Sequence, residues 1–259
     1  MKNKILITIN QMDEIKKLKE LGINNYAFPL KDFCVGMPNT FLVSEIKEDG
    51  FLFINRILDN EGIDKLKVIL KNLPKNIKGI IFDDLGILNI IKNLNIEKIL
   101  YLSHFNTNSK SINLYLNYVD TVVVSTDITR KEIEHIIKNA KKDLSLFVFG
   151  YVGVMYSRRL LLDNYSKFYN IDKINPLVIN NTNHKFLVYE NSCGTYFYHN
   201  KLFNGLELME LPAKYYFINS VFLDNGVIEN VLNNNLDNLD CDKGFLYNET
   251  IYKLKEEEK

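Results

Sequence analysis

Residues Thr121–Phe149, TVVVSTDITRKEIEHIIKNAKKDLSLFVF, contain a complete strand–helix–strand unit that decides the fold. Two nearly continuous apolar runs, Thr121–Ser125 and Leu144–Phe149, flank a segment with the apolar spacing of a helix. Thr129, with Glu132 three residues later, has the spacing of a capping box and marks the start of that helix. Continuous apolar strands are buried on both faces, as parallel strands covered by helices are. The unit therefore predicts a parallel α/β sheet.

The same alternation of strand-like and helix-like runs extends over most of the chain. Eight strands are expected, at Lys4–Ile9, Asn25–Leu30, Phe51–Asn55, Gly79–Phe82, Lys98–Leu102, Thr121–Ser125, Leu144–Phe149 and Tyr215–Val221. Eight strand–helix units predict a single-domain (β/α)8 TIM-barrel-like fold, in the α/β class. A doubly wound open sheet has the same periodicity and is the alternative.

The regular alternation stops after Phe149, and residues 151–211 are interpreted as an insertion after the seventh strand. The insertion contains a helical stretch and a predicted hairpin whose strands are Phe186–Glu190 and Thr195–His199. The glycines of Gly150–Gly153 predict a turn between the seventh strand and the insertion.

The composition excludes several classes of protein. The chain has 259 residues, 46% of them hydrophobic, and its 32 basic residues balance 32 acidic ones, so no general attraction to nucleic acid or to a membrane surface is expected. No apolar run approaches the roughly 18 residues of a membrane helix. The odd, scattered cysteines favour a reducing, cytoplasmic location; they are Cys34, Cys193 and Cys241. Residues 1–251 are expected to form the barrel domain, and the Lys- and Glu-rich residues 252–259 a frayed tail.

Polar side chains follow most of the predicted strands, where a barrel places its active site, although any soluble barrel has such a ring. They are Asn10, Lys31, Asp32, Asn55, Arg56, Asp83, Asp84, Ser103, His104, Thr126, Asp127, Asn219 and Ser220. Strand neighbours point to opposite faces, so only one of Asp83 and Asp84 is expected to face the mouth. Asp84 is the better acid–base candidate, with helix capping as its alternative role. Asn55 and Asp127 are candidate ligand-binding residues.

The segment after the seventh strand supplies the other site candidates. Tyr156 and Ser157 are candidate catalytic residues, and Arg158 and Arg159 follow them directly. A guanidinium group can hold a carboxylate or a phosphate with two parallel hydrogen bonds. The alternative for the arginines is a surface ion pair with Asp163. We favour a site that binds a small anionic or peptide ligand.

The hairpin also carries residue types that ligate metals, namely His184, Glu190, Cys193 and His199. Their spacing matches no tight zinc pattern, so no metal site is predicted. His104 is of the right type for a general base, but no motif ties a Ser or Cys nucleophile to it. The sequence has no phosphate-binding glycine loop and no metalloprotease or nucleophile-elbow motif.

Four stretches of the chain resemble the collagenase-like peptidase family, family U32. In Phe147–Tyr165, FVFGYVGVMYSRRLLLDNY, a strand is followed by a match to the family pattern Tyr-Ser-x-Arg-Cys-Leu-Leu-x-x-Tyr. Ile81–Gly86 (IFDDLG), Ser125–Ile133 (STDITRKEI) and Gly194–Tyr196 (GTY) are similar to further family motifs, in the same order along the chain. The resemblance implies a barrel-like catalytic domain and a peptidase.

The departures from the family pattern restrict what can be transferred. Relatives in this family support hydroxylation of RNA bases or of ubiquinone precursors, and carry an iron–sulfur cluster on four cysteines. Gly153 and Leu160 stand where the pattern has two of those cysteines, and Phe149 stands in place of its histidine. Cluster ligation needs thiolates. The resemblance therefore implies a short, cysteine-depleted branch without the cluster and with no other cofactor.

Three hypotheses follow for function. The first is a peptidase-like hydrolase with Asp84, Tyr156 and Ser157 as catalytic residues. The second is a factor for hydroxylation of tRNA or rRNA bases, which would make RNA a partner. The third is a non-catalytic barrel subunit that forms a homodimer or pairs with a paralogue.

Overall fold

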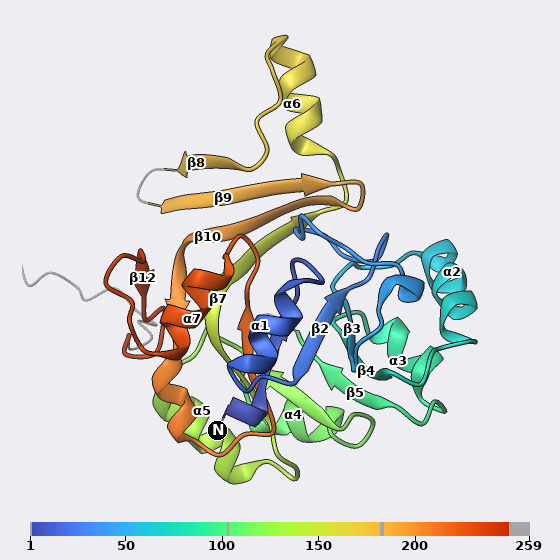
Figure 1. The fold of residues 1–259 in the computed structure, drawn as a ribbon, viewed down its shortest axis with the longest axis vertical. Helices are drawn as coiled ribbons and strands as arrows, with labels where there is room; N and C mark the ends of the chain where they lie inside the picture. Colours follow the sequence, from blue (N-terminus) through green and yellow to red (C-terminus); the bar gives the residue numbers. More distant parts are fainter. Residues whose placement is uncertain (1, 103, 182–183, 249–259) are drawn as a thin grey trace, which may run out of the picture.

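The computed structural model describes residues 2–102, 104–181 and 184–248; Ser103 and the predicted tail at 252–259 lie outside this part. Eight parallel strands form a closed barrel, which occupies the lower part of Figure 1. They are β1 (Ile5–Thr8), β2 (Asn25–Pro29), β3 (Gly50–Ile54), β4 (Ile77–Phe82), β5 (Glu97–Leu100), β6 (Thr121–Val124), β7 (Ser145–Ser157) and β11 (Tyr216–Asn219).

Strand β11 closes the barrel, because it pairs in parallel with both β1 and β7. Its residue Tyr216 lies opposite Ile5 on one side and opposite Leu146 on the other. The remaining strands are neighbours in sequence order, from β1 to β7. The prediction of a (β/α)8 barrel is confirmed, and the alternative of an open doubly wound sheet is wrong.

Aromatic side chains fill the interior of the barrel. The ring of Phe217 lies 6.0 Å from that of Phe53, 5.4 Å from that of Tyr101 and 5.8 Å from that of Phe147, measured between centroids. Complete burial of one such side chain stabilises a fold by roughly 1.5–3 kcal/mol. A packed interior leaves the ends of the strands as the place for a site.

The described residues contain seven α-helices: α1 (Glu14–Glu20), α2 (Asn60–Leu70), α3 (Leu85–Ile91), α4 (Ser109–Tyr115), α5 (Arg130–Asn139), α6 (Leu161–Tyr169) and α7 (Asn225–Leu232). Helix α5 begins with the predicted capping box of Thr129 and Glu132. The segment between β2 and β3 has only a 3-10 turn, η2 (Val43–Glu45); the other 3-10 turns are η1 (Lys2–Lys4) and η3 (Leu206–Glu210). Within the described ranges, no helix combines the length and the apolar character needed to cross a membrane.

Strand β7 continues far beyond the barrel, so the turn predicted at Gly150–Gly153 is wrong. The glycines lie within a continuous strand, where the absence of a side chain lets neighbouring groups come close to the backbone of β7. Gly150 has a φ of +125°, and a Cβ on it would collide with the backbone carbonyl of Asn219 in β11. A Cβ on Gly153 would collide with the ring of Tyr196. The sequence alone predicts a break here, because glycine is common both in turns and at close approaches within a strand.

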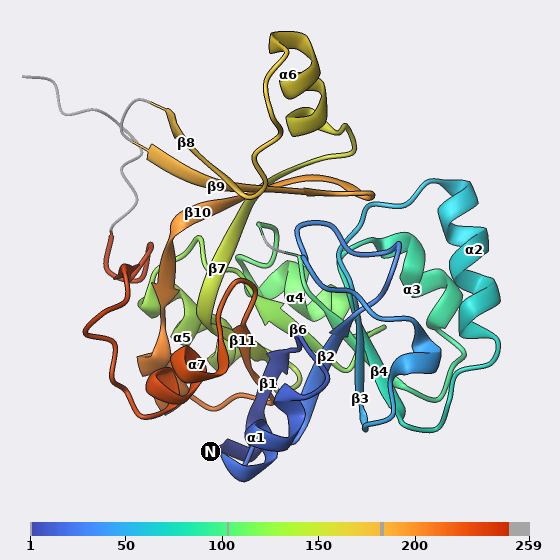
Figure 2. The same ribbon diagram turned by 45° about the horizontal axis from the view of Figure 1, so that its top comes forward.

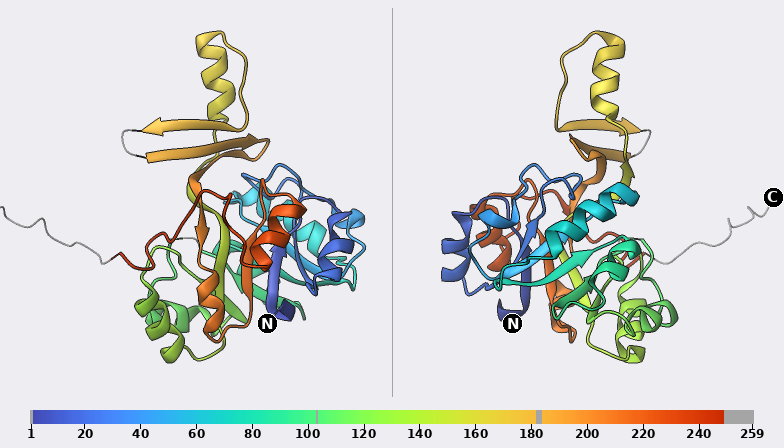
Figure 3. Two further views of the ribbon diagram at one scale, coloured as in Figure 1. Left: turned by 60° about the vertical axis from the view of Figure 1, so that its left-hand side comes forward. Right: turned by 90° about the vertical axis from the view of Figure 1, so that its right-hand side faces the viewer.

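The extended β7 supports a second, antiparallel layer that stands over the barrel (Figures 2 and 3). The chain returns through β8 (Leu177–Asn181), β9 (His184–Asn191) and β10 (Gly194–Asn204), and β10 pairs with β7. The predicted hairpin lies within β9 and β10. A short strand, β12 (Cys241–Asp242), pairs with β10 near the end of the described chain.

The inserted layer is tied to the barrel by the inner face of β10. Tyr198 is 1% exposed, and its hydroxyl donates a hydrogen bond of 2.9 Å to the carbonyl of Gly36, in the segment after β2. On the other side of the layer lies α6, whose first turn receives the carboxylate of Glu190 from β9. The insertion thus covers part of the end of the barrel at which the parallel strands finish.

Candidate active site

A cavity of about 180 Å³ lies at the carboxyl ends of the barrel strands, beneath the inserted layer. Its polar lining comes from several elements: Asn55 follows β3, Asp83 follows β4, His104 follows β5, Tyr156 lies near the end of β7, and Tyr196 belongs to β10. In barrels of this kind, active sites lie at this end. We call this space the mouth cavity.

Asp83 is the carboxylate that faces the mouth cavity. Its Oδ1 atom is buried and has no hydrogen-bond partner among the described residues. Burial raises the pKa of the Asp83 carboxyl to about 7, and the charge of Asp84 contributes to this increase. Hydrogen bonds from the backbone amides of both aspartates have a smaller, opposite effect on this pKa. The group can therefore both accept and donate a proton near neutral pH.

His104 also lines the mouth cavity, and Asp127 holds its ring. The Nδ1 atom of His104 lies 2.6 Å from Oδ2 of Asp127. This hydrogen bond raises the pKa of His104 above the usual value for histidine; burial opposes the shift, while the charge of Asp127 and a backbone contact with Val154 support it. The backbone amide of Asp127 in turn donates to the hydroxyl of Ser125, at 3.1 Å. The arrangement favours a charged imidazolium in a fixed orientation.

Asp84 has the capping role. Its Oδ1 atom accepts a hydrogen bond from the amide of Gly86 in the first turn of α3, at 2.7 Å. Its Oδ2 atom accepts one from the amide of Leu58, at 2.8 Å. Both oxygens are therefore engaged by the backbone, and Asp83 is the aspartate that lines the cavity.

Asn55 and Tyr156 reach the mouth cavity as predicted, but both have structural partners. The amide of Asn55 exchanges two hydrogen bonds with the backbone of Val35, at 2.9 and 3.0 Å, and so holds the segment after β2. The hydroxyl of Tyr156 donates to the carbonyl of Cys193, at 3.1 Å. Burial raises the pKa of Tyr156, and the charge of Arg56 opposes the shift.

Ser157, Arg158 and Arg159 lie at the rim, outside the cavity lining. The hydroxyl of Ser157 accepts a hydrogen bond from the amide of Arg159, at 3.1 Å. The guanidinium of Arg158 pairs with Asp59 at the start of α2, at 2.5 Å, so its ion-pair partner is not Asp163. Arg159 is exposed, and its guanidinium has no ion pair with a described residue.

Arg56 is a cation at the rim that the ligand-binding prediction did not include. Its guanidinium donates to the backbone carbonyl of Asp32, at 2.8 Å. Its Nε atom is buried and has no partner within the described chain. Its nearness to Tyr156 places a positive charge beside the mouth cavity. The signal for it was its position directly after Asn55, at the end of a barrel strand.

The residues present do not fit an iron–sulfur cluster. The chain has three cysteines, fewer than the four thiolates of the relatives, and all three are free. At Gly153, the space that a cysteine side chain needs is filled by Tyr196. The described ranges contain no group of three or more His, Cys, Asp or Glu side chains arranged to hold a metal. Glu190, one of the ligand types on the hairpin, is instead engaged by Thr195 and Lys173.

Restoring the two missing cysteines is expected to harm the fold without creating a cluster. Gly153→Cys forces the ring of Tyr196 to move, so we expect a loss of about 1–3 kcal/mol in the free energy of unfolding. Leu160→Cys alone, at a partly exposed position, serves as the matched control and is expected to cost less than about 1 kcal/mol. Urea denaturation measures both. Bound iron with visible absorption in the double variant, after anaerobic reconstitution, would contradict this reading of position 153.

Comparisons with known proteins place the chain in a family. A solved structure titled as the Bacillus cereus spore cortex-lytic enzyme SleL is similar at 11% identity, with a TM-score of 0.43 over 94% of this chain and 76% of that one. A search of curated proteins found no match. The model of peptidase family U32 matches residues 41–171, about half of the chain, which include β3 to β7 and α6. The chain belongs to peptidase family U32.

Proposed function

We propose that this protein is a peptidase-like hydrolase that cleaves peptide bonds with Asp83 and His104 as its acid–base pair. One observation carries the proposal: the carboxyl of Asp83, whose pKa is raised to about 7, and the imidazole of His104, whose pKa is raised above its usual value, line the same cavity at the carboxyl ends of the barrel strands. Membership of the family supports the peptidase class. Asp83 replaces Asp84 in this assignment.

The proposed reaction adds one water molecule across a peptide bond. The ionised Asp83 accepts a proton from the water as its oxygen bonds to the carbonyl carbon. The imidazolium of His104 gives a proton to the leaving nitrogen as the carbon–nitrogen bond breaks. Asp127 acts as a positioning residue, because it holds Nδ1 of His104 at 2.6 Å.

The rim offers groups for binding the rest of a peptide. Arg159 is exposed without an ion pair to a described residue, and Arg56 has a buried Nε–H without a described partner. Either guanidinium suits a carboxylate of the ligand. Arg158 is less available, because Asp59 already neutralises it. We further propose that no iron–sulfur cluster takes part, and that the protein is cytoplasmic, since its three cysteines are free thiols.

The test is cleavage of a mixture of peptides, followed by mass spectrometry. We expect His104→Gln to lower kcat/KM by about 10²–10⁴, the usual range for losing a general acid. Asp127→Asn is expected to lower kcat more than it raises KM, because it disturbs the orientation of the acid. His135→Gln, on the exposed surface of α5, is the matched control and should leave activity unchanged.

Two results would overturn the proposal. The first is a pure, folded protein that cleaves no peptide at any pH between 5 and 9. The second is full activity in His104→Gln. Altered modified nucleosides in a deletion strain would favour RNA-base hydroxylation instead, and stable copurification with a paralogue would favour the subunit hypothesis.

A further inference from the structure

The inserted sheet has an unprotected edge at β8, Leu177–Asn181. The strand order of this layer is β7-β10-β9-β8, and no described strand pairs with the outer side of β8. An edge strand presents unpaired N–H and C=O groups, and natural proteins protect such edges with charges, prolines or bulges. The sequence of β8, LVINN, has no charge and no proline. Its register with β9 is unbroken from Leu177↔Val188 to Asn181↔His184, so it has no bulge.

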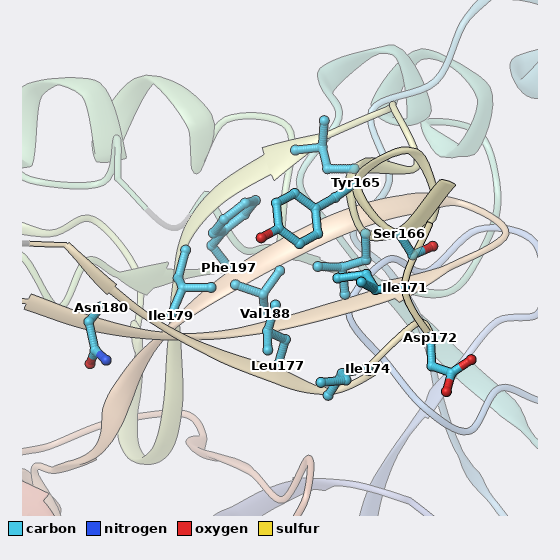
Figure 4. A pocket seen from close by; sticks show the side chains of 12 residues that line it. Tyr165, Ser166, Ile171, Asp172, Ile174, Leu177, Ile179, Asn180, Val188 and Phe197 are labelled. Atoms are coloured by element: carbon cyan, nitrogen blue, oxygen red, sulfur yellow. The ribbon is translucent and has the colours of Figure 1, made fainter. Parts of the chain in front are cut away.

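The surface around this edge is unusually apolar for a monomer. A groove of about 620 Å³ lies between α6 and the sheet (Figure 4). Its walls include Leu177 and Ile179 from β8 and Tyr165 from α6. Nearly half of the exposed large hydrophobic side chains of the described residues lie between positions 155 and 178, and Phe168 on α6 is 81% exposed. Exposed apolar side chains gathered beside a groove are a feature of binding surfaces.

The backbone and the charge of β8 together indicate what covers it. A free edge is completed by another strand, through main-chain hydrogen bonds. If two copies of β8 pair in antiparallel fashion around Ile179, Val178 lies opposite Asn180 and Leu177 opposite Asn181 of the other copy. This pairing brings no like charges together. A twofold axis relates the two strands in this pairing. Each copy uses its β8 edge once, so the assembly is a dimer and cannot grow further.

We propose that a second copy of this chain covers the β8 edge, which makes a symmetrical dimer with one continuous sheet of eight strands. The four strands β7, β10, β9 and β8 of each copy contribute to this sheet. The inference rests on the insertion alone and is independent of the reaction proposed for the mouth cavity.

Introducing charges at the edge tests the proposal. Val178 is 50% exposed and Asn180 is exposed, so both tolerate substitution. In Val178→Lys/Asn180→Lys, lysines face each other directly across the twofold axis, and the same holds for glutamates in Val178→Glu/Asn180→Glu. Sedimentation equilibrium of the full chain should give a dimer for the native protein and at least about tenfold weaker association for each variant. An equimolar mixture of the two variants should restore the dimer, because lysine then faces glutamate.

A lysine placed away from β8 serves as the matched control. Val68→Lys, at an exposed position of α2, should dimerise like the native protein. A monomeric native protein at 100 µM, dimers that both charged variants preserve, or variants whose mixture stays monomeric would each overturn the proposal. A native monomer that binds an extended apolar peptide along β8 would do so too, since the occupant would then be a different strand.

Discussion

Replacing Asp83 with Asn should lower kcat/KM for peptide cleavage by about 10²–10⁴. The variant keeps the size of the side chain but cannot accept the proton of the attacking water. Steady-state kinetics on a peptide that the native protein cleaves measures the effect. The control is Asp64→Asn, at an exposed position of α2 away from the mouth cavity, which should leave kcat/KM unchanged.

The same substitution should make the protein more stable at neutral pH, which separates lost chemistry from lost folding. The folded-state pKa of Asp83 is raised from 3.8 to about 7. Between these values the carboxyl is ionised in the unfolded chain and still protonated in the folded one, so its penalty on folding grows with pH and is complete above about 7. Asp83→Asn removes a penalty on the order of 2–4 kcal/mol there, and almost none below pH 4. Lower activity and lower stability together would contradict the account of this residue.

Replacing Glu190 with Ala is expected to cost about 3–5 kcal/mol in the stability of the insertion. The side chain of Glu190 is fully buried. Its carboxylate accepts hydrogen bonds from the amides of Leu162 and Asp163 at the start of α6, at 2.7 and 3.0 Å. It also accepts one from the hydroxyl of Thr195 at 2.6 Å and pairs with Lys173 at 2.7 Å. Removing it leaves these groups without their shared acceptor.

Hydrogen exchange of the α6 amides, together with urea denaturation, measures this effect. Burial alone would raise the pKa of Glu190, but its hydrogen bonds with Lys173 and Thr195 outweigh burial and lower it. Its contribution is therefore complete above its ordinary pKa of 4.5 and is lost as the pH falls through the lowered value. Glu61→Ala, in an exposed ion pair with Lys65, is the control and should cost less than about 1 kcal/mol. Equal costs for both variants would contradict the role given to Glu190.

Much of the fold could be predicted, because buried strands require runs of apolar residues that are visible in the sequence. Continuous apolar runs such as Thr121–Ser125 identified the barrel strands, and the capping box at Thr129 located α5. The continuation of β7 through Gly150 could not be predicted, because it depends on how closely β11 approaches. β8 was also missed, since two of its five residues are asparagines and its pairing depends on β9.

The sequence predicted polar side chains at the carboxyl ends of the barrel strands, and the mouth cavity lies there. Strand alternation separated the two aspartates, but Asp83, and not the predicted Asp84, lines the mouth cavity. The following Leu85 and Gly86 begin α3, so capping was the stronger signal for Asp84. His104 and Asp127 follow neighbouring strands, yet only the fold brings their side chains to 2.6 Å.

The partners of a surface ion pair depend on which side chains the fold brings together. The pairing of Arg158 with Asp59 joins residues 99 positions apart in the sequence. No periodicity or motif relates the end of β7 to the start of α2. The two arginines therefore indicated a charged rim, but only the structure shows that Arg158 is already paired while Arg56 and Arg159 are available to a ligand.

The pH dependence of kcat/KM, in the native protein and in Asp83→Asn, tests whether Asp83 is the group that accepts the proton of the attacking water. Native kcat/KM should rise with an apparent pKa near 7, as Asp83 ionises, and should fall as His104, whose pKa is raised above its usual value, loses its proton. The rising limb should be absent from the residual activity of Asp83→Asn. A rising limb that is unchanged in that variant would show that another group accepts the proton, and would contradict the assignment of Asp83.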